Sequence, residues 1–283
     1  MAKAADSSPA AKPLTITALR RHAEQVHSDI VLMADKQGVL HSEDIHGLRV
    51  ASKELRALWQ LLKPLLDKAE VRKALANLEQ AASLLSDSRD HQVAISTLQR
   101  LRQHSRNKDA RGALDEALAA LQAGAPDQAN QRAVDLQPFW QRDQQYWQAL
   151  NCTADAATLR KRGFDRLYNK AAKLARAARC DDDIRLWHKL RKWVKYLALT
   201  LPLQGTQELA DELGRLGKKL GRLHDLHQLL QRIEQLDWQR QAPQQAAYVK
   251  HLIRREEARL CQRCADLSST LFAPSPAQFI ARL

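Results

Sequence analysis

The sequence predicts an all-helical protein made of two similar halves, and three observations support this. Glycine and proline are scarce, with nine of each among 283 residues. Leu, Ala, Gln, Arg and Lys dominate the composition, and these residues lose little conformational freedom in a helix. Apolar residues recur with a period near 3.6, whereas the period-two alternation that is typical of strands is not apparent.

Prolines mark the ends of the candidate helices. Every proline lies where a helix could begin or end, and Pro64 and Pro202 each follow an apolar-periodic run. The period predicts two sets of helices. They run roughly over 15–37, 42–63, 68–86, 88–106 and 109–122, and then over 157–180, 183–201, 206–222, 223–238 and 242–271.

These ranges predict a domain organisation with two bundle repeats. Between them lies a glutamine-rich connector, whose Trp140 and Trp147 would dock part of it on the body. The tail could equally dock on the body, dock on a partner or fray. The expected segments are a disordered N-terminal segment at 1–14, a first repeat at 15–122, the connector at 123–156, a second repeat at 157–272 and a C-terminal tail at 273–283.

Two pairs of similar segments support an internal duplication. SEDIHGLRVASKELRALWQLLKP and CDDDIRLWHKLRKWVKYLALTLP both begin with an acidic helix-start signal, carry His-x-x-Arg-x-x-x-Lys, and end at a proline. Downstream, Arg89-Asp90 in the first half corresponds to His224-Asp225 in the second. We interpret both aspartates as helix caps or ion-pair partners that orient neighbouring basic side chains.

The charge balance favours a polyanionic partner. Forty-five Lys and Arg against 32 Asp and Glu give a formal net charge of +13, which suits nucleic acid, a phosphate polymer or an anionic membrane. Charge alone does not choose among them. The chain has no long apolar run, and its start lacks the apolar core of a secretory signal. We therefore expect a cytoplasmic protein with no membrane partner.

Basic side chains at helical spacing form candidate anion-binding stripes. The first lies within an arc of about 80° and consists of His46, Arg49, Lys53 and Arg56. The second repeats this geometry with His188, Arg191 and Lys195, and Lys192 lies nearby. Further basic residues on the flanking helices are Arg162, Arg166, Lys170, Lys173, Lys218, Lys219 and Arg222. Residues 158–222 hold seventeen Lys and Arg against seven Asp and Glu.

One such stripe is usually only a solvated helix face. The same order of His, Arg and Lys in two distant segments is harder to explain in that way. Each copy also follows a helix start, where the helix N-terminus favours anions. The duplicated pattern therefore predicts an anion-binding surface.

Signatures of catalysis and of metal binding are absent from the sequence. No glycine-rich phosphate loop, acidic cluster for magnesium or Ser-His-Asp arrangement stands out. A single C-x-x-C, Cys261 and Cys264, lies in a helical pattern without the second pair that a zinc site needs. With Cys152 and Cys180, these are interpreted as buried or unreactive thiols. We expect no catalytic residue, no metal and no cofactor.

The segments IHGLRVASKELRALWQLLKP, RKRGFDRLYNKAAKLARAARCDDDIRLWHKLRKWVKYL, LLSDSRDHQV and LGRLHDLHQLL resemble the CHAD family, the conserved histidine α-helical domain, over roughly 15–272. The resemblance implies two antiparallel bundles related by a pseudo-twofold axis. It also implies a basic central groove or pore that binds inorganic polyphosphate, and association with polyphosphate granules and possible granule proteins. The Glu-x-Glu-x-Lys signature of a CYTH triphosphate-tunnel domain, which many relatives carry, is missing, so we expect a stand-alone module.

Two positions depart from the family pattern. Ala198 stands where a second arginine is common, so the second stripe would bind less firmly or use Lys192 instead. Gln92 replaces the acidic residue often found after Arg-Asp.

The expected function is polyphosphate binding without enzymatic activity. The alternative is an RNA- or DNA-binding protein that uses the same basic groove, although the stripes offer few aromatic residues for base stacking beyond Tyr168, Trp193 and Tyr196. Two further rivals are an enzyme that acts on phosphate chains and a structural partner of granule proteins.

Overall fold

The structure, a computed structural model, describes residues 13–34, 42–84, 87–123, 136–181 and 183–283. Helices account for almost all of these residues, and no strand occurs within these ranges. The all-α fold class that composition and periodicity predicted is therefore confirmed.

The helices of the first half agree with the predicted ranges to within a few residues. The 3-10 turn η1, Lys63–Leu65, ends the second helix at Pro64, because proline cannot donate the backbone hydrogen bond that would continue it. The helices are α1 (Ile16–Ala34), α2 (Ser42–Leu62), α3 (Lys68–Leu84), α4 (Asp87–His104) and α5 (Lys108–Ala123).

The second half begins with an irregular helix. The π-helical turn η3, Leu159–Phe164, joins the short α7 (Ala156–Thr158) to α8 (Asp165–Cys180). A Cβ atom on Gly163 would lie 2.8 Å from the carbonyl oxygen of Leu61, so this close approach requires glycine. The remaining elements are α9 (Ile184–Thr200), η4 (Leu201–Gln204), α10 (Gln207–Gln235), α11 (Trp238–Gln241), α12 (Pro243–Leu271) and α13 (Pro276–Ala281).

One helix boundary was predicted wrongly. The ranges 206–222 and 223–238 were expected as two helices, but α10 runs through both without a break. Leu216, Leu220, Leu223 and Leu226 are all buried, so the apolar period continues across the expected junction, which contains no proline. At about 1.5 Å per residue, α10 is long enough to contact helices at both ends of the molecule.

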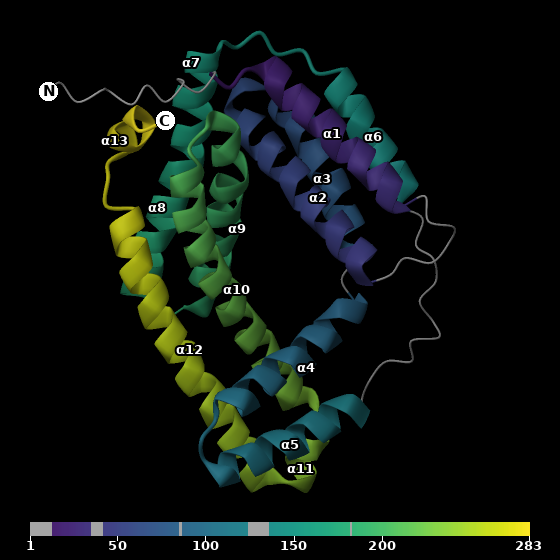
Figure 1. Ribbon diagram of the computed structural model, residues 1–283, viewed down its shortest axis with the longest axis vertical. Coiled ribbons are helices and arrows are strands. Elements are labelled where there is room, and N and C mark those ends of the chain that lie inside the picture. The colour runs from purple at the N-terminus through teal and green to yellow at the C-terminus, as the bar shows by residue number, and fades with distance from the viewer. Residues whose placement is uncertain (1–12, 35–41, 85–86, 124–135, 182) are drawn as a thin grey trace, which may run out of the picture.

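The helices group differently from the two consecutive bundles that the sequence suggested. In Figure 1, α1, α2, α3 and α6 lie together on one side, and α8 and α9 lie beside them. Helices α4 and α5 do not join this first group. They pack instead at the other end of the molecule on α10 and α12, which belong to the second half of the chain.

The predicted connector contains a helix, α6 (Gln137–Gln148), that a buried polar network fixes to the body. Asp143 is fully buried and accepts a hydrogen bond from Trp59 Nε1 at 2.9 Å. Its other oxygen lies 3.0 Å from Nε2 of His27, whose Nδ1 donates to the carbonyl of Ala23 at 2.7 Å. Burial raises the pKa of Asp143. The network joins α1, α2 and α6.

Both connector tryptophans, Trp140 and Trp147, are buried. This confirms that aromatic residues dock this segment. The C-terminal tail docks on the body as well: the ring of Phe279 stacks on Tyr168 with centroids 4.1 Å apart, and the Tyr168 hydroxyl donates to the carbonyl of Pro274 at 2.6 Å. At the other end, the expected disordered segment 1–14 lies outside the described residues as far as residue 12, but Leu14 is buried.

Candidate functional site

The two helices that carry the duplicated motif, α2 and α9, pack against each other. Leu48, Leu55, Leu58 and Leu62 of α2 are all buried, and this apolar face fixes the rotation of the helix about its axis. The basic stripe is thereby held beside the core. His46 is exposed, whereas Arg49, Lys53 and Arg56 are half-buried.

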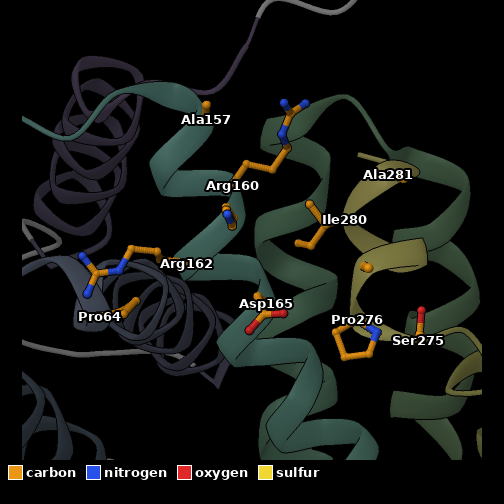
Figure 2. A pocket seen from close by; sticks show the side chains of 11 residues that line it. Pro64, Ala157, Arg160, Arg162, Asp165, Ser275, Pro276, Ile280 and Ala281 are labelled. Carbon is orange, nitrogen blue, oxygen red and sulfur yellow. The ribbon is translucent and has the colours of Figure 1, made fainter.

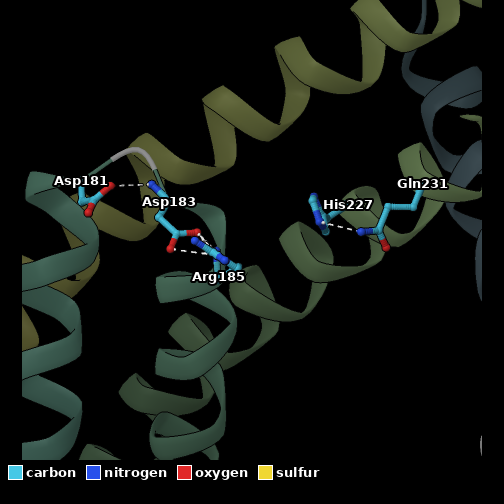
Figure 3. Close-up of polar contacts among 5 residues, drawn as sticks. All are labelled: Asp181, Asp183, Arg185, His227 and Gln231. Atoms are coloured by element: carbon cyan, nitrogen blue, oxygen red, sulfur yellow. Dashed lines mark hydrogen bonds and ion pairs between the residues drawn. The ribbon is translucent and has the colours of Figure 1, made fainter.

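The start of α9 is fixed by the acidic residues that the sequence identified as a helix-start signal. Asp183 is the N-cap: its carboxylate accepts from the backbone N–H of Arg185 at 2.9 Å and from Arg185 Nε at 2.8 Å. Asp181 in turn accepts from the backbone N–H of Asp183, also at 2.9 Å (Figure 3). The contacts to Arg185 lower the pKa of Asp183.

The second stripe follows from this start. Trp187, Leu190, Val194 and Leu197 are buried and set the rotation of α9 as the leucines set that of α2. The motif residues then lie at the edge of the buried face. Half-buried positions are His188, Arg191 and Lys195, and Lys192 is more exposed.

Arg56 and Lys192 bring positive charge together where α2 and α9 meet. Partial burial and then the charge of Arg56 lower the pKa of Lys192. Arg56 also influences the buried Tyr196, whose pKa is raised by burial. One carboxylate balances this charge: Glu79 Oε1 lies 3.4 Å from Arg56 Nη2, and the Glu79 side chain is 69% exposed.

Lys63 and its neighbour Arg72, which add to this positive charge, were not identified in the sequence. Burial and then the charges of Arg166, Arg72, Lys170 and Lys192 lower the pKa of Lys63. Lys63 follows Arg56 by seven residues and so continues the first stripe by two turns, a signal that could have identified it. Arg72 belongs to α3 and follows no such pattern. We call Arg56, Lys63 and Lys192 the basic cluster.

Arg166, one of the predicted binding residues, makes contacts within the protein. Its Nη1 donates to the backbone carbonyl of Gln60 at 2.9 Å and its Nη2 to the side-chain oxygen of the same residue at 3.1 Å. Its guanidinium also lies 5.2 Å from the ring centroid of Trp193, within the range of a cation–π contact. These contacts join α8, α2 and α9, so Arg166 stabilises the packing, and two of its five N–H donors are bonded to Gln60.

The other predicted residues on flanking helices do not converge on one point. Arg162 lines an open pocket of about 1100 Å³ between η3 and α13, with Arg160, Asp165 and Ile280 (Figure 2). Lys219 lies near Cys264 of α12, where its charge partly offsets the effect of burial on the thiol. The other predicted binding residues on these helices have exposed side chains: Lys170, Lys173, Lys218 and Arg222.

A second focus of titratable side chains lies between α9 and α10. The ring of His188 is 4.7 Å from that of His224 and 5.0 Å from that of His227, measured between centroids. Arg191 and Lys195 of the second stripe act on the same rings. We call the three histidines the histidine cluster. His227 was not predicted, because only the contact with α9 distinguishes it from any other histidine on a helix.

Burial is the first cause of the low pKa values in this cluster. It lowers the pKa of His188 to about 4, and the charges of His227 and Arg191 act in the same direction. The pKa of His224 also falls to about 4, through burial and then the charge of Arg191. Both imidazoles are consequently neutral near pH 7.

The described residues offer few other reactive groups. Within them, no group of three or more His, Cys, Asp or Glu side chains has a geometry that could hold a metal ion. Cys264 is buried, and burial raises the pKa of its thiol to about 12. Such a thiol is a poor nucleophile and a poor metal ligand. Among the same residues, no helix is long and apolar enough to cross a membrane.

Comparisons with known proteins agree with this architecture. A structural match is found with the crystal structure of the CHAD domain from the plant Ricinus communis, with a TM-score of 0.63, 20% sequence identity and coverage of 96% of each chain. At that identity the likeness concerns the fold. No curated protein matches the sequence significantly. The family model described as CHAD domain matches residues 16–203, which is well over half of the chain, and the protein therefore belongs to the CHAD domain family.

Proposed function

We propose that this chain binds inorganic polyphosphate along α2 and α9 and works as a binding module without enzymatic activity. The main support is the packing of the two motif helices against each other, which partly buries Lys192 and holds it near the charge of Arg56, and both effects lower the pKa of that lysine. Like charges held together in this way repel one another. A polyanion relieves the repulsion.

The proposed path of the phosphate chain connects the two foci of charge. At one end lies the basic cluster, at the junction of α2 and α9; at the other lies the histidine cluster, between α9 and α10. Arg191, Lys192 and Lys195 of α9 lie along the way. Arginine can contact two phosphate oxygens with its planar fork, whereas lysine acts as a point charge. Polyphosphate has no bases to read, so selectivity would come from charge density and from the shape of the surface.

The aromatic residues favour polyphosphate over nucleic acid. Tyr168 is buried under Phe279, Tyr196 is buried, and Trp193 packs against Arg166. A single-strand binder needs aromatic faces that are open to bases, and these three are already in contact with the protein. RNA or DNA would therefore gain charge contacts but little stacking. Association with polyphosphate granules follows from the same binding and needs no separate partner.

The proposal is tested by removing one arginine from each motif helix. The double variant Arg49→Ala/Arg191→Ala should bind long-chain polyphosphate about tenfold or more weakly, since each basic contact to a phosphate contributes on the order of 1 kcal/mol. A matched control, Arg100→Ala/Arg240→Ala, removes two exposed arginines from α4 and α11 and lowers the net charge equally. Calorimetric titration at two salt concentrations measures both, and circular dichroism verifies the helices.

Four outcomes would contradict the proposal. If the control loses as much affinity as the motif variant, binding depends only on net charge. If RNA displaces polyphosphate at equal phosphate concentration, the nucleic-acid alternative is correct. Release of phosphate in the presence of magnesium or manganese would instead indicate an enzyme. Binding that survives high salt would indicate contacts other than those with phosphates, as expected of a structural partner of granule proteins.

A further inference from the structure

The histidine cluster is an unusual arrangement for a polyanion-binding surface. Two of its ring nitrogens, Nε2 of His188 and Nδ1 of His224, are buried and make no hydrogen bond within the described part of the chain. Buried polar atoms normally have partners. A phosphate oxygen would accept hydrogen bonds from both nitrogens, provided that both carry a proton.

The charges around the cluster come from three elements. On the α9 side, Arg191 and Lys195 oppose protonation and Asp183 favours it. From α12, Glu257 Oε1 lies 3.7 Å from Nδ1 of His227, and Arg254 and Glu234 lie near Glu257. On α10, Gln231 contacts Nε2 of His227 at 3.2 Å (Figure 3), and Asp225 is the direct neighbour of His224 in the chain. Among the described side chains of α4, His91 meets α10 further along, at Arg232.

The internal duplication makes the chemistry of this position informative. The segment that contains His224-Asp225 corresponds to the one that contains Arg89-Asp90. One half of the chain therefore has a permanently charged arginine where the other half has a histidine, whose charge depends on pH. At this position the first half carries a fixed positive charge, and the second half carries one only when its histidine is protonated.

From this geometry, we propose that His188, His224 and His227 form a phosphate subsite that takes up protons when a polyphosphate chain enters. The inference rests on the proposed function and goes beyond it by making binding dependent on pH. The entering anion neutralises Arg191 and Lys195, the cations that oppose protonation, and offers oxygen acceptors to the imidazolium N–H groups. Each proton taken up adds one positive charge and one donor to the site.

The sign and size of the effect follow from linkage. In the free protein the pKa of His188 and that of His224 are about 4. If the anion restores one of them to the ordinary value of about 6.5, affinity should rise about tenfold between pH 7.5 and pH 5.5. The protein should also take up close to one proton per binding event near pH 5.5.

Calorimetry with long-chain polyphosphate measures both quantities. Titrations at pH 5.5 and at pH 7.5, each in two buffers with different ionisation enthalpies, give the affinity and the number of protons taken up. Long chains are chosen because few of their phosphates are terminal groups that titrate near neutral pH. His104→Gln on α4 and His251→Gln on α12, both of which replace exposed histidines, measure the general contribution of histidine charge.

Two substitutions at one position separate charge from structure. His224→Gln should bind as weakly at pH 5.5 as wild-type protein binds at pH 7.5. His224→Arg, the residue found in the corresponding segment, should bind tightly at both pH values. Proton NMR of the histidine rings in wild-type protein needs no substitution, and it should show the pKa values of the cluster rising when polyphosphate is added.

The outcomes distinguish this inference from the proposed function. Binding that is equally tight at both pH values, or a pH dependence that persists in full in His224→Gln, overturns the proton-linked subsite and leaves polyphosphate binding intact. The same holds if the ring signals of the cluster do not respond to polyphosphate. No binding at either pH overturns the proposed function, and the subsite with it.

Discussion

Helices α2 and α9 carry the same motif in different surroundings. His46 of α2 is exposed at the surface, whereas the ring of His188 in α9 lies within 5.0 Å of two further histidines. Equal spacing in the sequence gives both residues an equivalent place on their helices. The neighbouring helix then decides the surroundings of each ring, and α10 places two further histidines beside His188.

The same two helices also differ ten residues after the histidine. Arg56 of α2 lies where the helices meet, whereas Ala198 of α9 is half-buried and packs against the core. Both helices therefore contribute charge at the junction, through Arg56 and Lys192, and α9 in addition places His188 beside the histidines of α10. The comparison shows that the two copies keep the same spacing in the sequence while their side chains lie in different surroundings.

The largest effect is expected at the contact between Gly163 and Leu61, which holds α2 beside the second half. Gly163→Ala should lower the free energy of unfolding by about 2 kcal/mol, the usual cost of overpacking, because the new Cβ would lie 2.8 Å from the carbonyl oxygen of Leu61. The matched change Gly112→Ala in α5, where nothing lies within 4 Å, should instead raise it by up to about 1 kcal/mol. Urea unfolding measures both. A Gly163→Ala protein as stable as wild type would show that the two halves can move apart at no cost.

The pH dependence of stability tests the difference between the two histidines. The pKa of His188 falls from 6.5 to about 4 in the folded protein, so the unfolded chain binds its proton more readily. The stabilising effect is complete above about pH 6.5 and is lost as the pH falls towards about 4. After allowance for the partial exposure of the ring, the loss is on the order of 1 kcal/mol.

Substitution separates this effect from general acid destabilisation. His188→Gln should reduce the loss of stability between pH 7 and pH 4.5 in thermal unfolding experiments by more than His46→Gln, which replaces an exposed ring. Equal slopes in the two variants would mean that the surroundings of the histidines do not distinguish them.

The sequence predicted the parts of the structure that depend on local pattern. The register of α2 and α9 followed from their apolar faces, and the start of α9 followed from Asp183, whose side chain caps the helix as its position suggested. The docking of α6 followed from Trp140 and Trp147, which are large apolar residues in a polar segment.

Features that depend on distant neighbours were not predictable in this way. Arg166 has the spacing of a surface residue, and only the position of Gln60 on α2 shows that two of its N–H donors bond within the protein. His227 became significant only when α9 placed His188 beside it. The packing of α4 and α5 on the second half depends on the length of α10, and the apolar period that extends this helix can be read equally well as two shorter helices.

The smallest expected effect concerns Arg56 and Ala198. Arg56→Ala should weaken polyphosphate binding about fivefold and lower the slope of log K against log salt by about 1, as expected for the loss of one phosphate contact. Adding Ala198→Arg to this variant should restore part of the affinity if α2 and α9 present one surface to the ligand. Arg100→Ala, which also removes one charge, should change affinity less. If Ala198→Arg restores nothing in a protein that remains folded, the two helices bind separate stretches of polyphosphate, and the duplication serves two sites instead of one.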